Sequence, residues 1–312
     1  MNIVYELEKL ERPLANPVLT IGNFDGVHRG HLALFNKVRE RAGAIGGQSA
    51  VMTFEPHPVK LMKPHKGPFL ITPTKQKLEL IAEAGIDVLF CLRFDREFAS
   101  IPPEDFVNRI LLDKIGIREI VVGYDYTFGR RRRGNIALLR EMGRRLGYTV
   151  HVMEPVHVNG TLVSSTSIRK CIREGDLAEA GRLLGRDYQI RGTVVRGQNR
   201  GGRLLGFPTA NLEVLDELLP KPGVYAVHVQ IEREGHLGVT NIGTNPTFGN
   251  GGISVETHIL DFSENVLGKA MRISFIERLR DEKTFNSIEE LSDQIARDID
   301  RARRVFRSRE AA

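Results

Sequence analysis

Two histidines stand three residues apart at the end of a glycine-rich segment that runs from Gly22 to His31. A helix is predicted to begin at Gly30, so His28 and His31 can point to one side of its entrance. Imidazoles beside the free N–H groups of a helix start can donate hydrogen bonds to an oxygen that gains negative charge during a reaction. The segment therefore predicts a phosphate-binding site, with Asp25 placed to help hold the turn.

The glycines of this segment narrow its interpretation. Gly22, Gly26 and Gly30 let a backbone come close to a ligand. The segment lacks the Gly-Lys-Ser/Thr ending of a Walker phosphate loop, and the chain contains no Gly-x-Gly-x-x-Gly dinucleotide fingerprint. Two alternatives stay open. One is a metal site on the two histidines, for which no third ligand lies nearby, and the other is ordinary turn chemistry of the glycines.

Hydroxyl side chains precede another predicted helix, in the run Ser164-Ser165-Thr166-Ser167-Ile168-Arg169. Such hydroxyls can cap the helix, its N–H groups then face a phosphate, and Arg169 can reach that phosphate from the first turn. A cap of this kind is common on its own. Paired with the histidine segment across a parallel sheet, it predicts the other half of a nucleotide site.

Aromatic side chains occur in two further segments that follow predicted strands, residues 53–58 and 122–129. Ligands of parallel sheets bind beyond the carboxyl ends of the strands, so both segments should border one crevice. Phe54, Tyr124 and Phe128 could stack there on an aromatic ligand. Burial of these rings in the core explains them equally well.

The second half of the chain carries a different set of polar residues. Thr209 and Asn211 alternate by two, so they face one side of an extended chain. A hydroxyl and an amide oxygen together suit a hard cation such as Mg²⁺ that is also bound to phosphates. The glycine-rich basic stretch from Gly197 to Arg203 could close over those phosphates. Glu256 alternates with apolar neighbours on a predicted strand and could accept a proton from a substrate hydroxyl. An ordinary solvent-exposed position on the strand explains this glutamate about as well.

Strand and helix patterns alternate through the first half of the chain. Strands are predicted at residues 17–21, 49–54, 87–94, 119–123 and 148–153, and helices at 30–41, 74–84, 102–115, 135–146, 164–173 and 177–184. In the second of these helices, Leu78, Leu80 and Ile81 mark the apolar side. Such alternation implies a parallel sheet covered on both faces. We therefore expect an N-terminal α/β domain of Rossmann-like type over residues 1–184.

The pattern changes after residue 184. Short β runs are predicted at residues 188–195, 223–230, 237–241, 255–260 and 270–275, separated by clusters of Gly, Pro and Asn. They indicate a compact antiparallel β-barrel or sandwich over residues 185–312. The chain closes with a long helix, for which Ser287 and Glu290 can form a capping box and Ile288, Leu291, Ile295 and Ile299 the apolar stripe.

Bulk composition excludes several classes of protein. The 312 residues are 41% hydrophobic and 27% charged, which is typical of globular chains. No stretch predicts a membrane span or a signal peptide, and the two cysteines suit a reducing cytoplasm. The net charge of +6 comes largely from Arg130–Arg133 and the C-terminal arginines. It fits polyphosphate substrates or a solvated face, since no nucleic-acid motif accompanies it.

The two sets of motifs together resemble a known family. His28-x-Gly30-His31 with Ser164–Arg169 looks like the nucleotidylyltransferase superfamily, and Gly206–Leu212 with Glu256–Phe262 resembles riboflavin kinase. The chain from about Val18 to Phe285 is thus similar to the bacterial bifunctional riboflavin kinase/FMN adenylyltransferases (FAD synthetases). The resemblance implies a nucleotidylyltransferase α/β domain followed by a riboflavin kinase-like antiparallel barrel with its C-terminal helix.

The resemblance also implies roles for individual residues. As catalytic residues it implies Glu256, His28, His31 and Arg169. As nucleotide-binding residues it implies Gly22, Phe24, Gly30, Ser164, Ser165, Thr166, Gly197, Arg203, Thr209 and Asn211, the last two also as ligands of Mg²⁺. As flavin-binding residues it implies Phe54, His57, Tyr124, Asp125, Phe128 and Arg280.

The same resemblance implies substrates and products. Riboflavin, FMN and ATP would be consumed, and FMN, FAD, ADP and pyrophosphate would be formed, in the cytoplasm and without a nucleic-acid or membrane partner. Self-association stays open. Two departures from the family pattern are a Gly197–Arg203 loop that is one residue longer than usual and Tyr126 after Asp125, where Phe is common.

Two alternatives remain at the level of function. One is another nucleotidylyltransferase fused to a non-catalytic β domain. The other is a binding protein, either a flavin sensor or a nucleic-acid module that uses the basic runs.

Overall fold

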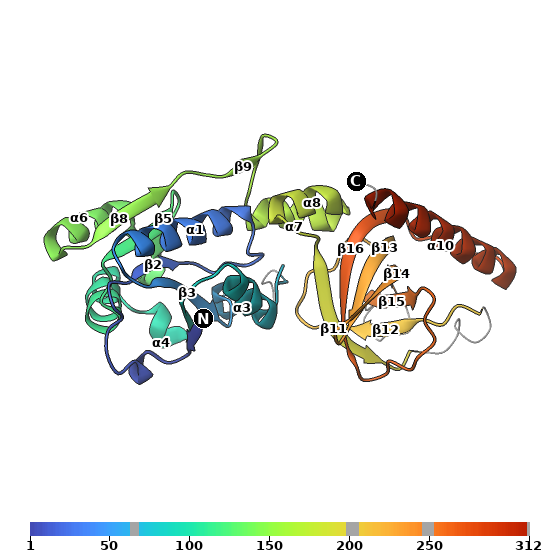
Figure 1. Ribbon diagram of the computed structural model, residues 1–312, viewed down its shortest axis with the longest axis horizontal. Helices are drawn as coiled ribbons and strands as arrows, with labels where there is room; N and C mark the ends of the chain where they lie inside the picture. The colour runs from blue at the N-terminus through green and yellow to red at the C-terminus, as the bar shows by residue number, and fades with distance from the viewer. Residues whose placement is uncertain (63–68, 198–205, 245–252, 311–312) are drawn as a thin grey trace. The chain divides into compact units, whose positions relative to one another are not determined.

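A computed structural model describes residues 1–62, 69–197, 206–244 and 253–310 of the chain. The chain forms two compact units, Met1–Ser165 and Thr166–Ala312 (Figure 1). Each unit has its own sheet and its own apolar core. In the part of the chain that the structure describes, no helix combines the length and the apolar character needed to cross a membrane.

The first unit is built on a sheet of six strands in the order β1-β4-β3-β2-β5-β8, all parallel. The strands are β1 (Asn2–Val4), β2 (Val18–Ile21), β3 (Ser49–Glu55), β4 (Val88–Arg93), β5 (Glu119–Gly123) and β8 (Thr149–Met153). The expected parallel sheet is confirmed. The sequence analysis did not predict β1, a three-residue edge strand that pairs with β4.

Helices cover both faces of this sheet. On one face, Val51 and Leu89 pack with Phe35 of α1 (Arg29–Ala44) and Ile81 of α3 (Thr74–Glu83). On the other face, the strands pack against η2 (Phe106–Ile115) and α6 (Ile136–Leu146) in the largest apolar cluster of the unit. Because both faces of the sheet are covered, successive residues of a strand are buried on opposite sides, which explains the continuous apolar runs in the sequence.

One helix of the first unit departs from the expected geometry. The predicted helix 102–115 begins as α5 (Pro103–Asp105) and continues as the π-helix η2, which ends at Gly116 in the left-handed conformation (φ 76°). The short elements of this unit are α2 (Pro58–Met62), α4 (Arg96–Ala99), η1 (Leu7–Lys9), η3 (Arg130–Arg132), β6 (Thr127–Phe128), β7 (Gly134–Asn135), β9 (His157–Val158) and β10 (Thr161–Leu162).

The second unit is a closed antiparallel barrel of six strands in the order β11-β12-β15-β14-β13-β16. Its strands are β11 (Gln189–Val195), β12 (Ala210–Glu213), β13 (Gly223–Ile231), β14 (Glu234–Thr244), β15 (Ile253–Ile259) and β16 (Ala270–Arg280). The expected barrel is confirmed, with β12 as a strand that the sequence analysis described only as extended chain. Two helices precede it, α7 (Ser165–Glu174) and α8 (Leu177–Leu184).

The expected C-terminal helix is present as α10 (Ile288–Glu310), drawn in red along the barrel in Figure 1. Its capping serine is in place, since Ser287 Oγ accepts the N–H of Glu290 at 3.2 Å. The helix contacts the barrel mainly through Ala302 and Phe306, which pack on β13 and β14 residues. Ile288, which the predicted apolar stripe included, is more than half exposed (54%).

Candidate active sites

His28 caps the first helix that follows the sheet's central strand. β2 ends at Ile21, α1 begins at Arg29, and His28 Nδ1 accepts the backbone N–H of His31 at 3.3 Å. A nitrogen that accepts a hydrogen bond carries no proton, so the proton of neutral His28 lies on Nε2. In this tautomer, Nε2–H is the hydrogen-bond donor of the buried His28 ring.

The two histidine rings lie against each other. Their centroids are 3.5 Å apart with an interplanar angle of 19°, and the rings of Phe24 and His31 form a T-shaped pair with centroids 5.1 Å apart. Gly30 lies close to the His28 ring, since a Cβ at this position would lie 3.2 Å from two of its ring atoms. The sequence-predicted pairing of the two imidazoles at the helix entrance is what the structure shows.

The turn before His28 has an unusual backbone. Phe24 (φ 50°) and Val27 (φ 38°) both lie in the left-handed region, which bulky and β-branched side chains rarely adopt. Both side chains are buried, and the Phe24 ring packs onto bare Gly22 and edge-on against Phe35 at 4.9 Å. Such strain persists only where the surroundings hold it, and it is concentrated at functional turns.

Asp25 fastens this turn from within. Its buried carboxylate accepts the backbone N–H groups of Ile71 and Thr72 at 3.0 Å each, and Thr72 Oγ1 accepts the N–H of Gly26 at 2.9 Å. The segment just before α3 therefore braces the turn, as the sequence analysis expected of Asp25. On the other side, Ser165 Oγ donates to the carbonyl of Asp25 at 2.9 Å.

The other residues of the run Ser164–Arg169 lie on either side of Ser165. Ser164 precedes α7, while Thr166 and Arg169 lie in its first turns, which by their contacts belong to the second unit. The run therefore straddles the division between the two units.

The aromatic side chains that the sequence analysis singled out have different environments. Phe54 is buried against Phe94 and Phe98 with ring centroids 5.5 and 5.4 Å away. Phe128 is likewise buried, with Phe106 and Tyr126 both at 5.7 Å.

Tyr124 alone of the three predicted stacking residues presents a substantially exposed ring (46%). The neighbouring Asp125 is also exposed. His57 is buried, and its Nδ1 accepts the backbone N–H of Val59 at 3.2 Å.

In the second unit, polar side chains lie in one row across neighbouring strands of the barrel. Asn211 on β12 pairs with Val195 on β11 and with Glu256 on β15, and Glu256 pairs with Asn241 on β14. Directly opposed residues of antiparallel strands point to the same face. Asn211, Glu256 and Asn241 therefore share one side of the barrel wall.

Glu256 is half-buried in this row, and burial raises the pKa of its carboxyl above the ordinary value. A carboxylate with a raised pKa is a better proton acceptor near neutral pH. The amide of Asn211 lies directly against Gly197, where a Cβ would sit 2.1 Å from Nδ2. Gly197 thus leaves the space that the Asn211 side chain occupies.

Thr209 is exposed and lies one residue before β12. Its backbone is fixed through the preceding residue, because the carbonyl of Pro208 lies 2.8 Å from Nδ1 of His258, two residues beyond Glu256 on the same face. Arg203, Gly201 and Gly202 lie outside the described residues.

Arg280 makes a bidentate ion pair with Asp298 of α10, with N···O distances of 2.8 to 3.0 Å. Its guanidinium also stands 5.8 Å from the centre of the Phe285 ring. These contacts hold the helix to the end of β16, so the residue expected beside the flavin is also a structural anchor.

Sequence reasoning missed Asn241 and His258. Both lie on strands that the sequence predicts, at residues 237–241 and 255–260. The two-residue spacing places His258 on the same face of the strand as Glu256, whereas the place of Asn241 beside Glu256 depends on strand register, which local alternation does not specify.

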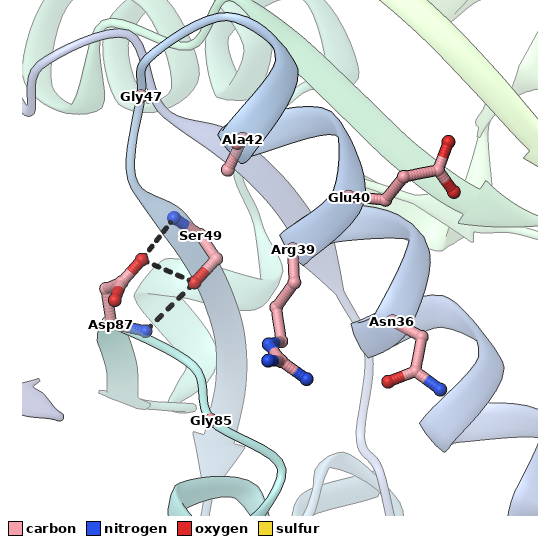
Figure 2. Close-up of a pocket in the computed structure, with 9 residues that line it drawn as sticks. Asn36, Arg39, Glu40, Ala42, Gly47, Ser49, Gly85 and Asp87 are labelled. Carbon is pink, nitrogen blue, oxygen red and sulfur yellow. Dashed lines mark hydrogen bonds between the residues drawn. The ribbon is translucent and has the colours of Figure 1, made fainter.

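A separate pocket of about 550 Å³ opens at the opposite edge of the first sheet, where β3 and β4 begin (Figure 2). Asn36, Arg39 and Glu40 of α1 line it together with Ser49 and Asp87, although the Glu40 side chain points away from that pair. The Asp87 carboxylate accepts from both the N–H and the hydroxyl of Ser49. The pocket is lined by none of the predicted site residues. Among the described residues there is also no group of three or more His, Cys, Asp or Glu side chains that could hold a metal ion.

Comparisons with known proteins divide the chain in the same way as its two sheets. A family profile described as FAD synthetase matches residues 11–167, and one described as riboflavin kinase matches residues 184–306.

Full-length relatives agree with the two profiles. The chain is 38% identical to the bifunctional riboflavin kinase/FMN adenylyltransferase of Escherichia coli strain K12 over 98% of both chains. It is also 38% identical to the proteins of the same description from Pseudomonas fluorescens (97% of both) and Listeria monocytogenes (93% of both). Among solved structures, a Streptococcus pneumoniae protein titled macrolide-efflux protein matches with a TM-score of 0.87 and 31% identity, over 96% of this chain and 98% of that one.

Proposed function

The chain belongs to the family of bifunctional riboflavin kinase/FMN adenylyltransferases, and from that premise we propose which residues perform the two reactions. It is an ATP-using enzyme that phosphorylates riboflavin to FMN and then adenylylates FMN to FAD with release of pyrophosphate. The observation that supports the residue assignment best is the pair of separate polar constellations, one per unit. The row at Glu256 offers a carboxylate base, and the turn at His28 offers donors.

The barrel row supplies what a kinase needs. Glu256 accepts the proton of the terminal ribityl hydroxyl of riboflavin as that oxygen attacks the γ-phosphorus of ATP, and ADP leaves. Its half-buried position and its raised pKa both favour this role. Phosphoryl transfer otherwise depends on positioning and charge stabilisation, which we assign to Asn211, Thr209 and the loop that begins at Gly197.

Thr209 and Asn211 fit Mg²⁺ by the chemistry of their donors. Both offer neutral, hard oxygens, and a magnesium ion that is bound mostly by substrate phosphates and water needs only one or two protein ligands. When bound, the ion neutralises charge on the ATP phosphates. The residues' own task is to orient the polyphosphate, and the contact of Pro208 with His258 keeps Thr209 in place for it.

The turn between β2 and α1 supplies what adenylyl transfer needs. The FMN phosphate attacks the α-phosphorus of ATP, the bond to the β,γ-pyrophosphate breaks, and FAD forms. A phosphate monoester is already a competent nucleophile, so this site needs donors for the growing negative charge and no base. The Nε2–H of His28, His31 and the helix N-terminus are such donors.

From the family resemblance we also assign nucleotide contacts to Ser164, Ser165, Thr166 and Arg169, as helix-cap hydroxyls and a guanidinium suit. Tyr124, whose ring is exposed, and Asp125 border the flavin. Phe54 and Phe128 form the buried wall behind it, together with His57.

Two substitutions test the assignment in one assay. Riboflavin and Mg-ATP are supplied to the enzyme, and FMN and FAD are separated by chromatography. Glu256→Gln, which keeps the shape but cannot accept the proton, abolishes FMN formation and leaves conversion of added FMN to FAD intact. His31→Ala does the reverse, with FAD formation reduced by about 10²–10³-fold because one donor to developing charge is gone. Loss of both activities in either variant contradicts the two-site assignment.

A further inference from the structure

A lysine that no motif contains lies buried beneath the adenylyl-transfer turn. Lys77, on the first turns of α3, is only 4% exposed. Its ammonium donates to the carbonyl of Asn23 at 3.3 Å, to the carbonyl of Phe54 at 3.2 Å and to Thr53 Oγ1 at 3.1 Å. Three N–H groups thus meet three oxygen acceptors, so the ammonium is fully hydrogen-bonded.

These acceptors belong to the ends of two adjacent parallel strands. Asn23 follows β2 in the strained turn, while Thr53 and Phe54 lie at the carboxyl end of β3. The Thr53 hydroxyl adds a second link, because it donates to the carbonyl of Asn23 at 3.1 Å. Lys77 and Thr53 together tie the turn that carries His28 to the segment that leads to His57.

Burying the ammonium of Lys77 costs free energy, and better packing does not account for its presence. All three hydrogen bonds go to uncharged oxygens, and burial lowers the pKa of Lys77 despite the nearby Cys91, Glu55 and Asp25. An apolar side chain of similar volume usually packs a core at least as well as a buried charge. A cation retained here is therefore explained better by what it holds than by the stability it adds.

We propose that Lys77 is a positioning residue for adenylyl transfer. It fixes the backbone of the β2–α1 turn against the end of β3, and so fixes His28 and His31 relative to the flavin-bordering segment. Asp25 braces the same turn from the segment 71–72, so α3 and its approach hold the turn by two independent contacts. The inference rests on the proposed adenylyl-transfer site.

The test measures kcat and KM for conversion of FMN to FAD, at a temperature well below unfolding. Lys77→Met keeps the volume and removes the ammonium. We expect its kcat to fall by about 10–100-fold, since a displacement of the donors by about 1 Å has effects of that size. The kinase rate, which belongs to the other unit, stays within about twofold of wild type. Lys77→Arg, which keeps a cation, recovers part of the lost kcat.

Lys75→Met is the matched control, because Lys75 lies on the same turn of α3 and is exposed. It leaves both activities at the wild-type level. Thr53→Val serves as a second variant if Lys77→Met does not fold. It removes only the bridging hydroxyl, and we expect a severalfold lower kcat for FAD formation.

The outcomes separate the inference from the function on which it rests. A wild-type chain that makes FMN but no FAD overturns the proposed site and the inference together. If the wild type makes FAD, a wild-type kcat in Lys77→Met, or in Thr53→Val where the former does not fold, overturns the inference alone. A loss of thermal stability with unchanged kcat has the same consequence, because it shows a purely structural lysine.

Discussion

At Gly30, the addition of a single methyl group should be enough to disturb adenylyl transfer. A Cβ there would lie 3.2 Å from Cε1 and Nδ1 of His28, and that ring has little room to yield because it stacks on His31. We expect Gly30→Ala to lower the rate of FAD formation by about 10–100-fold, as misplaced donors do. The measurement is the rate of FMN adenylylation, with the kinase rate as internal reference.

Gly43→Ala is the control for this substitution. Gly43 lies in the same helix, and a Cβ there would meet no atom within 4 Å. Alanine in a helix interior is more favourable than glycine by roughly 0.5–1 kcal/mol, so this variant should be active and slightly more stable. Equal rates in the two variants would show that His28 does not depend on the space at Gly30.

At the residue scale, local spacing predicts which side chains are polar neighbours but not what they meet. The alternation of Thr209 and Asn211 and the isolated carboxylate of Glu256 were visible in the sequence. That Glu256 lies opposite both Asn211 and Asn241 is a matter of register across three strands.

The sequence analysis also missed Lys77, because a lysine is expected on the solvated face of a helix. The sequence analysis took Leu78, Leu80 and Ile81 as the apolar side of α3, and all three do pack into one apolar cluster, but Gln76 and Lys77 of that helix are buried as well. A lysine on an amphipathic helix normally predicts a solvated face, and only the tertiary contact with β3 shows otherwise.

At the scale of elements, one ion pair joins three parts of the first unit. Glu119, at the start of β5, accepts two hydrogen bonds of 2.8 Å from Arg41 of α1 and lies 2.7 Å from Nε2 of His151 on β8. The hydrogen bonds from Arg41 hold the pKa of Glu119 below its ordinary value, against the opposing effect of burial. A carboxyl with a lowered folded pKa contributes stability above its unfolded pKa, and that contribution is lost as pH falls through the folded value.

Glu119→Gln should therefore destabilise the first unit at neutral pH by roughly 1–3 kcal/mol, the usual range for a buried group that loses its partner. The difference from wild type should shrink as the pH is lowered through the acid range. Urea unfolding of the first unit at several pH values measures this. Glu40→Gln is the control, because Glu40 pairs with Lys37 at the surface, where solvent screens the attraction between the two charges. A pH-independent difference for Glu119→Gln contradicts the assignment.

The type of most elements was predictable because apolar periodicity is local, and the two sheets confirm it. The π-geometry of η2 was not, since hydrogen bonding from i to i+5 leaves no signature in the residues themselves. The edge strand β1 has only three residues, too few to establish a period. β12 has only four residues, carries Asn211 and directly follows Gly206-Phe207-Pro208-Thr209, so its composition resembles a loop until it pairs with β11 and β15.

At the scale of the whole molecule, the two reactions are assigned to units with separate cores. The product of the barrel is the substrate of the parallel-sheet unit, and FMN can reach it through solution. We therefore expect complementation: a mixture of full-length Glu256→Gln and His31→Ala proteins makes FAD from riboflavin, although neither variant does so at an appreciable rate alone. FAD should appear after a lag while FMN accumulates, as followed by chromatography over time.

A mixture that forms FMN but no FAD, from two variants that each retain the other activity, would contradict this expectation. It would show that FMN is passed on only within one molecule. Adding free FMN to the mixture is the control, because it bypasses the first step and should yield FAD at the rate of Glu256→Gln alone.

The closure of the barrel has a consequence for where the enzyme begins to aggregate. A barrel has no terminal strand on which a foreign chain can pair, whereas the open sheet of the first unit ends in β1 on one side and β8 on the other. Exposed strand edges are where intermolecular β-sheet formation begins. When the enzyme is heated or expressed in excess, aggregation of the described strands should therefore start from the adenylyl-transferring unit, and ligands that stiffen its sheet should keep the whole chain in solution.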